Sequence, residues 1–341
     1  MTAREEIAFN RALGALVGGA LGDAMGMPTQ LLSPAEIKAD YGFVDHFLDP
    51  APDHPVSRGL KAGAVTDDTE QTLLLASVLL KSGRSFDHQA WVNALIAWEE
   101  DIKARGGYDL LGPSTKRAID AINAGTSPEE AGRHGETNGA AMRIAPVGIL
   151  VPPSDALVAR VAETCRATHN TTIAISAAAA VATVISRGID GADWREASGF
   201  AVAAARAGEK QGHWVPGGTI AARIEWALDM VDGCLVEEGI SRVFDRLGTG
   251  VISQESVPAA FAVLKLAEGD AWKAAVIAAN LGGDTDTIGA IAGSMAGACA
   301  GYDSLPAERI ESLVGIDLAE VRRLARALVQ ARLAGTESRH G

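Results

Sequence analysis

A polar loop rich in Gly, Thr and Asp leads into an apolar, helix-like run at least four times along this chain. Two of these loops are acidic, at residues 66–69 (TDDT) and 282–287 (GGDTDT). Hydroxyl and carboxylate oxygens at such positions usually accept the unpaired N–H groups of a first helical turn. The repetition predicts helices packed on helices, with several helix starts meeting around one pocket.

The composition also favours an all-α fold. Hydrophobic residues make up 48% of the 341 residues, alanine runs are frequent, and strand-like alternation of branched and aromatic residues is scarce. No Pro/Ser-rich linker or charge block divides the chain, so we expect a single domain over residues 1–341. An amphipathic helix is expected over about residues 319–333, followed by a tail that frays.

The net charge of −13 argues against a nucleic-acid partner, which would need clusters of Lys and Arg. Cys165, Cys234 and Cys299 are odd in number and widely spaced in apolar sequence, which predicts buried free thiols in a reducing compartment. The N-terminus has no cleavable signal pattern, and the uncharged runs 171–186 and 287–302 are too short to cross a bilayer. We therefore expect a cytoplasmic protein without membrane contact.

The first helix carries an unusual glycine pattern. Gly14, Gly18 and Gly22 recur every four residues, a spacing that lets two helices approach closely. Asp23 follows Gly22 directly, and Pro28, shortly after it, should end the helix. An acid at this point either caps a neighbouring helix or faces a site.

The next stretch, residues 31–60, contains four prolines and is typical of a long surface excursion, such as a lid. It leads to the helix that starts at the first acidic loop, where Asp67 and Glu70 have the spacing of a capping box and Gly83 ends the helix.

Three further loops precede apolar helices. Asn138-Gly139 is typical of a turn, and His169 before an alanine-rich helix is typical of a cap or a satisfied core histidine. The loop Gly217-Gly218-Thr219 repeats the same format. These loops are candidates for the rim of the shared pocket.

The two acidic loops together offer hard oxygen ligands without a His or Cys pattern: Thr66, Asp67, Asp68, Asp284, Asp286 and Thr287. Crowded carboxylates repel one another, so either they lie far apart or a cation holds them together. Such ligands suit Mg²⁺ or Mn²⁺, with Ca²⁺ possible, and four carboxylates exceed what one Mg²⁺ normally takes from a protein. Two ions would use them all and could activate a water.

Five motifs occur in a familiar order: GALGDAMG, TDDT, TNGAAMRIAP, TH before an alanine-rich helix, and GGDTDTIGAIAG. In this order the chain resembles the ADP-ribosylglycohydrolase family, the relatives of dinitrogenase reductase-activating glycohydrolase, over about residues 12–303. The surroundings of GDAMGMPTQ, LGPSTKRAI and SVPAA are similar to an uncharacterised bacterial branch of that family.

The resemblance implies an orthogonal helical bundle with a binuclear Mg²⁺ or Mn²⁺ centre at converging helix N-termini. It further implies hydrolysis of an N- or O-glycosidic bond at the anomeric carbon of ribose. By family pattern the six oxygen ligands above hold the ions, with Asp286 between them, and Asp67, Asp68 and Asp286 are catalytic. The residues implied at the substrate are Asp23, Gln30, Asn138, Gly139, His169, Gly217, Gly218 and Thr219.

Two positions depart from the family pattern. Active relatives have a flap glutamate where this chain has Gln30, and glutamine cannot act as a general base. The nitrogenase-type enzymes have an aspartate at the position that corresponds to Leu110 here, with Asp109 one position away. Neither departure touches the proposed metal ligands.

Three hypotheses follow. The first is a metal-dependent hydrolase of ADP-ribosyl conjugates, such as ADP-ribosyl-arginine or an ADP-ribosylated protein. The second is a hydrolase of smaller ribosides or nucleosides. The third, a catalytically silent ribosyl-ligand binder, is disfavoured by the complete set of acidic ligands.

Overall fold

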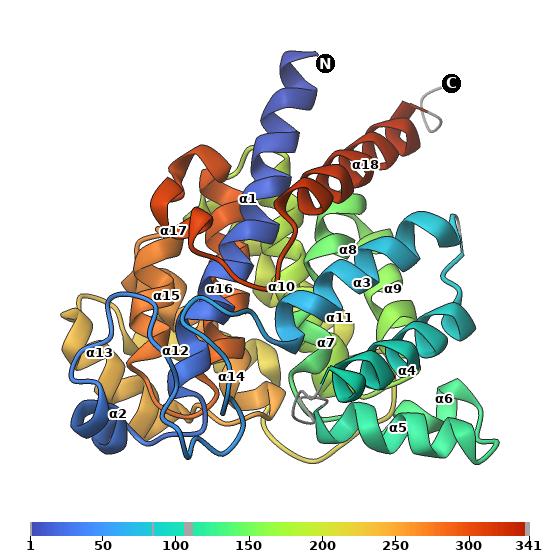
Figure 1. Cartoon of the computed structure of the whole chain (residues 1–341). Helices are drawn as coiled ribbons and strands as arrows, with labels where there is room; N and C mark the ends of the chain where they lie inside the picture. Colours follow the sequence, from blue (N-terminus) through green and yellow to red (C-terminus); the bar gives the residue numbers. More distant parts are fainter. Residues whose placement is uncertain (1, 84, 106–111, 338–341) are drawn as a thin grey trace.

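The structure is a computed structural model that describes residues 2–83, 85–105 and 112–337 (Figure 1). These residues form eighteen α-helices and no strand, with three isolated β-bridges between loops. The expected all-α fold is confirmed.

The first part of the chain contains α1 (Ala3–Gly26), α2 (Pro34–Asp40), α3 (Asp67–Ser82), α4 (His88–Ala104) and α5 (Pro113–Asn123). The middle contains α6 (Pro128–Ala131), α7 (Gly139–Met142), α8 (Ala145–Leu150), α9 (Asp155–Cys165), α10 (Thr172–Ile189), α11 (Trp194–Gly208), α12 (Ile220–Met230) and α13 (Val236–Arg242). The last part contains α14 (Ser253–Leu266), α15 (Ala271–Ala279), α16 (Thr285–Ala300), α17 (Ala307–Glu311) and α18 (Leu318–Glu337). Short 3-10 helices and one π-helix complete the list: η1 (Met27–Thr29), η2 (Gly132–His134) and η4 (Tyr302–Ser304) are 3-10 helices, and η3 (Val243–Leu247) is the π-helix.

Helices α1 and α16 pack antiparallel at the centre of the molecule through their glycines. A Cβ atom on Gly18 would lie 2.5 Å from the carbonyl oxygen of Gly293, and one on Gly289 would lie 2.5 Å from that of Gly22. The two backbones are therefore in direct contact, as the four-residue spacing predicted. This seam places the C-terminal end of α1 beside the N-terminal end of α16, where the second acidic loop lies.

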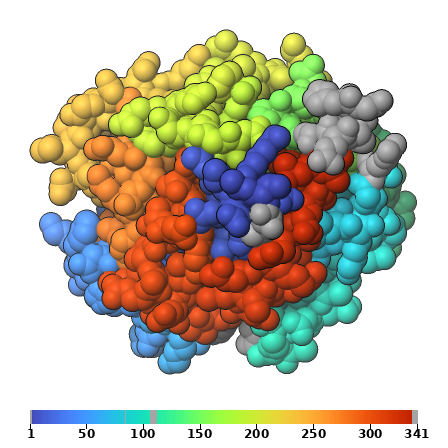
Figure 2. All heavy atoms as spheres, turned by 90° about the horizontal axis from the view of Figure 1, so that it is seen from above, coloured from blue at the N-terminus to red at the C-terminus, as the bar shows by residue number. Residues whose placement is uncertain are grey.

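The remaining helices surround this pair. Seen from above, the first residues of α1 emerge at the centre of one face, between the C-terminal helices and the yellow-green segment of α11 (Figure 2). Helix α1 begins and α18 ends at the same end of the molecule (Figure 1). The buried apolar side chains form one cluster that includes side chains of both central helices and of α10.

The expectation that the run 171–186 is too short to cross a bilayer does not hold for helix α10, which contains most of this run. It continues through Arg187 to Ile189, so its 18 residues, with a mean hydropathy of 1.6, are long and apolar enough to cross a membrane. In this fold 89% of that window is buried inside the molecule, as in a core helix. No other helix among the described residues passes the same test of length and composition.

Two local expectations are wrong. The excursion 31–60 contains a helix, α2, because Ser33 and Glu36 form a capping box with Pro34 at the first helical position. The predicted capping box of Asp67 and Glu70 is not formed. Glu70 instead accepts a hydrogen bond from the indole N–H of Trp98, and the cap of α3 comes from another helix, as described below.

The cysteines are free, as expected, although Cys234 is only half-buried while Cys165 and Cys299 are buried. The C-terminal helix extends slightly beyond its predicted bounds, over Leu318–Glu337. The predicted fraying of the tail concerns residues 338–341, which lie outside the described residues.

Candidate active site

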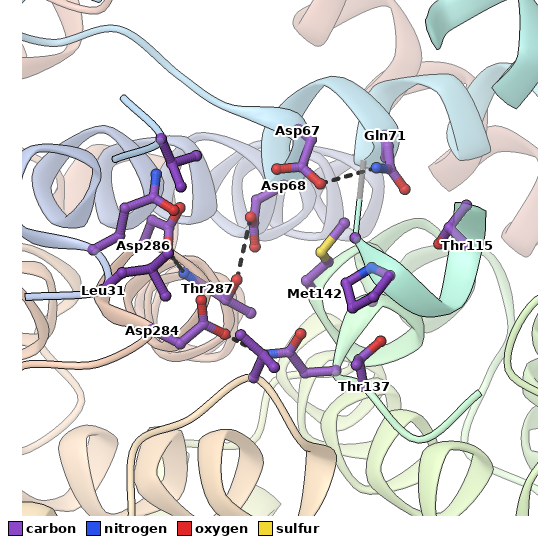
Figure 3. A pocket seen from close by; sticks show the side chains of 17 residues that line it. Leu31, Asp67, Asp68, Gln71, Thr115, Thr137, Met142, Asp284, Asp286 and Thr287 are labelled. Atoms are coloured by element: carbon purple, nitrogen blue, oxygen red, sulfur yellow. Dashed lines mark hydrogen bonds between the residues drawn. The ribbon is translucent and has the colours of Figure 1, made fainter. Parts of the chain in front are cut away.

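A cavity of about 200 Å³ lies where the N-terminal ends of α3 and α16 meet. Its floor is acidic: Asp67 and Asp68 come from the first turn of α3, and Asp284 and Asp286 come from the start of α16 (Figure 3). The other lining residues are neutral: Gln30, Leu31, Val56, Gln71, Gly112, Pro113, Thr115, Thr137, Asn138, Gly139, Met142, Val251 and Thr287. The two acidic loops, more than 200 residues apart in sequence, therefore form one site, as predicted.

Asp23 caps the neighbouring helix rather than facing this cavity. Its fully buried carboxylate accepts hydrogen bonds from the backbone N–H groups of Thr66 (2.9 Å) and Thr69 (3.1 Å) and from both of their hydroxyls. Thr66, the N-cap residue of α3, makes no side-chain cap of its own. Burial raises the pKa of Asp23 to about 6. Of its two predicted alternatives, the structure favours the cap.

Neutral partners orient the acidic floor. Asn138 donates to Asp284 Oδ2 at 2.5 Å and to Ser256, and the Thr287 hydroxyl lies 3.3 Å from Asp68 Oδ2 (Figure 3). The second oxygen of that carboxylate, Asp68 Oδ1, is buried and has no hydrogen-bond partner. A buried carboxylate oxygen without a donor is costly, so it marks a place for a ligand.

The carboxylates destabilise one another's charged forms. Burial, followed by repulsion from neighbouring aspartates, raises the pKa of Asp67, Asp68 and Asp286 well above the ordinary value of 3.8. Burial also raises the pKa of Asp284, although the hydrogen bond from Asn138 offsets part of that effect. Cations that bind between these carboxylates relieve the repulsion and therefore stabilise the site.

The donor set fits Mg²⁺ or Mn²⁺, because every group on the floor is a hard oxygen and Asp68 Oδ1 lacks a partner. Among the described residues, no three or more acidic, imidazole or thiolate groups are already spaced as a metal cage. Thr66 is the predicted ligand that does not line the cavity. Its hydroxyl donates to Asp23 at 2.8 Å and lies 3.5 Å from Asp68 Oδ2.

One buried cation stands behind the floor. Arg143 is 2% exposed and donates to Gln71 Oε1 at 2.6 Å, while Gln71 Nε2 donates to Asp67 Oδ2 at 3.0 Å. The guanidinium also lies 5.1 Å from the centre of the Trp91 ring. Burial lowers the pKa of Arg143 to about 10, and the nearby Asp67 and Asp68 act against that fall. The cation therefore stays charged and orients the Gln71 amide, which in turn holds Asp67 Oδ2.

His169 lies behind the cavity wall rather than on it. The side chain is fully buried, with Nε2 3.1 Å from the Thr137 hydroxyl. Burial and the nearby Arg143 hold the pKa of His169 well below its usual value, so the imidazole is neutral. Asn138 and Gly139 line the cavity directly, whereas His169 packs behind Gly139. A Cβ atom on Gly139 would lie 3.0 Å from the His169 ring.

The loop Gly217-Gly218-Thr219 does not line the acidic cavity. It borders a separate cavity of about 180 Å³ together with the exposed Trp214. The Thr219 hydroxyl caps α12, and Gln254 Nε2 donates to the Gly218 carbonyl at 2.7 Å, so the loop is turned toward α12. The loop, which was expected in the substrate cleft, therefore lies outside the acidic cavity.

Gln30 lines the cavity beside the exposed Leu31. Its Nε2 donates to Ser57 Oγ at 2.9 Å, and Ser57 donates to the Met27 carbonyl at 2.8 Å. Next to it, Leu31 has a φ of 62°, and its N–H donates to the Gly283 carbonyl at 2.6 Å. A strained non-glycine backbone at a cavity mouth is a common mark of a functional site.

Some residues of this site lie outside the motifs singled out in the sequence, although a local sequence pattern marks several of them. Gln71 lies four positions after Asp67 and therefore on the same face of α3. Thr137 and Arg143 flank the Asn-Gly motif, and Arg143 is a lone cation within apolar sequence. Ser57 and Thr115 carried no local signal. Leu110 and Asp109, where the chain departs from the family pattern, lie outside the described residues.

Comparison with known proteins agrees with this geometry. The ADP-ribosylglycohydrolase family profile matches residues 4–337. The uncharacterised protein YegU of Escherichia coli K12 is 36% identical, over 94% of this chain and 97% of YegU. The ADP-ribosylarginine hydrolase Tri1 of Pseudomonas putida is 28% identical, over 92% of this chain and 76% of Tri1.

A solved structure described as an ADP-ribosylglycohydrolase-related protein complex superposes with a TM-score of 0.72 at 26% identity, covering 96% of this chain and 99% of that one. Family profile, relatives and fold thus agree along nearly the whole chain. The chain belongs to the ADP-ribosylglycohydrolase family, whose members are hydrolases that act on glycosyl bonds.

Proposed function

We propose that this protein hydrolyses the glycosidic bond at the anomeric carbon of ribose in an ADP-ribosyl conjugate, such as ADP-ribosyl-arginine, with two Mg²⁺ or Mn²⁺ ions as cofactors. The observation that carries the proposal is the orphaned Asp68 Oδ1 on a floor of four carboxylates, of which Asp68, Asp284 and Asp286 are buried and Asp67 is half-buried. The name of Tri1 supports the choice of conjugate.

The residues proposed to hold the ions are Thr66, Asp67, Asp68, Asp284, Asp286 and Thr287. When bound, the ions would supply a Lewis acid that orients the ribose hydroxyls and lowers the pKa of a water. Gln71 holds Asp67 Oδ2, and Asn138 holds Asp284 Oδ2, so each of these carboxylates keeps a fixed orientation. Preorganisation of this kind lowers the cost of reaching the transition state.

In this proposal the Asp67 carboxylate takes a proton from the attacking water through the oxygen that Gln71 does not hold. The water oxygen then bonds to the anomeric carbon, while the glycosidic bond breaks and its electron pair leaves with the aglycone. The departing atom of the aglycone takes up one proton, which balances the proton that water gives to Asp67, so the products are ADP-ribose and the free aglycone. Gln30 at the cavity mouth binds substrate by hydrogen bonds and transfers no proton, because an amide has no ionisable group in this range.

The test is release of ADP-ribose from ADP-ribosyl-arginine by metal-loaded and chelated protein. Loaded wild type should release it, while chelated wild type and loaded Asp286→Asn should be slower by about two orders of magnitude or more. Absence of release by loaded wild type, with nucleosides cleaved instead, would overturn the choice of substrate.

A smaller riboside is the second candidate. Among the described residues that line the cavity of about 200 Å³ there is no Lys or Arg to pair with a diphosphate, and the partly exposed Leu31, Val56 and Val251 are apolar. A neutral nucleoside suits such a cavity better than a charged conjugate does.

We further propose that residues 1–341 act as one domain in the cytoplasm. A single hydrophobic cluster supports the first statement. Three free cysteines and a net charge of −13 support the second.

A further inference from the structure

The buried guanidinium of Arg143 fixes the direction of the hydrogen bonds behind the cavity wall. Arginine has donors only, so every polar neighbour within reach must accept from it. Its Nη2 lies 2.7 Å from Thr168 Oγ1 and 3.3 Å from His169 Nδ1. Both of these atoms are therefore acceptors toward Arg143.

The same geometry fixes the tautomer of His169. Thr168 Oγ1, which accepts from Arg143, lies 2.8 Å from His169 Nδ1 and can direct its single proton there. A proton on Nδ1 would face the Arg143 donor, so this nitrogen is unprotonated. A neutral imidazole carries one ring proton, which must then be on Nε2.

The proton on His169 Nε2 points at the cavity wall. Nε2 lies 3.1 Å from Thr137 Oγ1, so the imidazole donates and the threonine hydroxyl accepts. The proton of that hydroxyl remains available for another acceptor. Thr137 itself is held firmly, because its carbonyl accepts from Ser253 Oγ at 2.9 Å and the next residue's N–H donates to the Val251 carbonyl at 2.9 Å.

Two neighbouring amides on this wall already donate to the acidic floor. The amide nitrogen of Asn138 donates to Ser256 at 3.0 Å and to Asp284 at 2.5 Å, which occupies both of its hydrogens. The amide of Gln71 donates to Asp67. Thr137 therefore offers an uncommitted donor beside a floor of acceptors (Figure 3).

We propose that Thr137 determines specificity by donating a hydrogen bond to an oxygen acceptor of the bound riboside, with Arg143 and His169 holding its hydroxyl in the donating orientation. The inference rests on the proposed function, because it assumes that the acidic cavity binds a riboside. It assigns Thr137 to binding and Arg143 and His169 to positioning.

The test compares Thr137→Val, which keeps the shape and removes the donor, with Thr137→Ser, which keeps the donor. Calorimetric binding of ADP-ribose and of adenosine to the Mg²⁺-loaded protein should weaken about tenfold for Thr137→Val and stay within about twofold for Thr137→Ser. In turnover, Thr137→Val should raise KM more than it lowers kcat. The exposed Thr126→Val is the matched control and should change none of these values.

A second measurement needs no ligand. The ¹⁵N chemical shifts of His169 should report an unprotonated Nδ1 and a protonated Nε2 in wild type. A protonated Nδ1, or unchanged binding of both probes by folded Thr137→Val, would overturn the proposal. If wild type binds adenosine and not ADP-ribose, the proposed conjugate is wrong while Thr137 is still judged with adenosine. If neither probe binds, the proposed function fails. The ¹⁵N shifts of His169 then still test the direction of the hydrogen bond between His169 and Thr137.

Discussion

Asn138 donates a hydrogen bond from Nδ2 to Oδ2 of Asp284, 146 residues further along the chain. This contact joins the Asn-Gly turn before α7 to the acidic loop before α16 and gives Asp284 one orientation. The same amide holds Ser256 on α14, so three elements meet at one side chain. A turn motif that is ordinary in sequence thus becomes part of the wall of the cavity.

The first prediction is that divalent metal stabilises the fold. Ions that bind four crowded carboxylates remove their repulsion, and ligands that bind only the folded state raise its stability. Exhaustive chelation should lower the melting temperature, and Mg²⁺ or Mn²⁺ should restore it. Asp68→Asn should abolish the response, whereas the exposed Asp303→Asn should keep it. An unchanged melting curve after chelation of a loaded sample would contradict the metal assignment.

The second prediction concerns pH. Because burial raises the pKa of Asp67, Asp68 and Asp286 above 3.8, the folded metal-free protein holds protons that the unfolded chain has released. The stability of the metal-free protein should therefore fall as the pH rises from 3.8 to the raised pKa values of the folded state, because in this range the folded state binds more protons than the unfolded chain.

Metal binding requires the ionised carboxylates, so it should release those protons. Mg²⁺ titrations at about pH 6, in buffers of different ionisation enthalpy, should give binding enthalpies that differ in proportion to the protons released. Equal enthalpies in all buffers would mean that the carboxylates are already ionised before metal binds.

The third prediction separates two buried aspartates. Asp23→Ala leaves two backbone N–H groups and two hydroxyls without their acceptor, which should cost about 3 kcal/mol or more of unfolding free energy. Asp286→Ala removes one of several repelling charges, so the metal-free protein should be as stable as wild type or more stable. Activity should show the reverse order among folded variants, with the larger loss in Asp286→Ala. Equal activity losses would remove the special role given to Asp286.

The acidic pocket was predictable because its signals are local. Carboxylates and hydroxyls at residues 66–69 and 282–287 mark helix starts, and the repulsion among them required either separation or a cation. The glycines of α1 predicted a close helix partner for the same reason, since spacing along one helix defines one face.

What could not be predicted depends on contacts between distant segments. The cap of α3 comes from Asp23, 43 residues before Thr66, so the local capping-box pattern of Asp67 and Glu70 was misleading. The loop 217–219 shares glycine and threonine with the acidic loops and also precedes a helix, yet its carbonyl at Gly218 is held by Gln254 on α14. Composition identifies a helix start and does not show which cavity that start faces.

The fourth prediction tests the glycine seam. Gly18→Ala would place a methyl group 2.5 Å from the Gly293 carbonyl oxygen and should lower the unfolding free energy by about 1–3 kcal/mol. Gly199→Ala in α11 is the matched control, because its added Cβ meets nothing within 4 Å. That variant should raise stability by about 0.4–1 kcal/mol. Denaturant unfolding of both proteins measures the difference, and a neutral Gly18→Ala would show that the two helices can separate at little cost.

The last prediction concerns Gln30, where the chain carries an amide in place of the flap glutamate of active relatives. Proton transfer by a well-placed carboxylate is worth roughly 10²–10⁴ in rate, and Gln30 lacks it. Wild type should therefore be a slow ADP-ribosyl hydrolase, and Gln30→Glu should raise the rate on ADP-ribosyl-arginine at least about tenfold. Metal affinity should not change, because the amide contacts Ser57 and none of the proposed ligands.

Ser57 provides the control for that variant. Its hydroxyl proton now goes to the Met27 carbonyl, so it accepts from Gln30 Nε2 and would have to turn in order to donate to a glutamate. Ser57→Ala in the Gln30→Glu background should free the carboxylate and keep or increase the gain in rate. Suppose instead that wild type is already fast and neither change alters the rate. Catalysis would then depend on the carboxylates of the floor alone, with Gln30 serving only to close the mouth of the cavity.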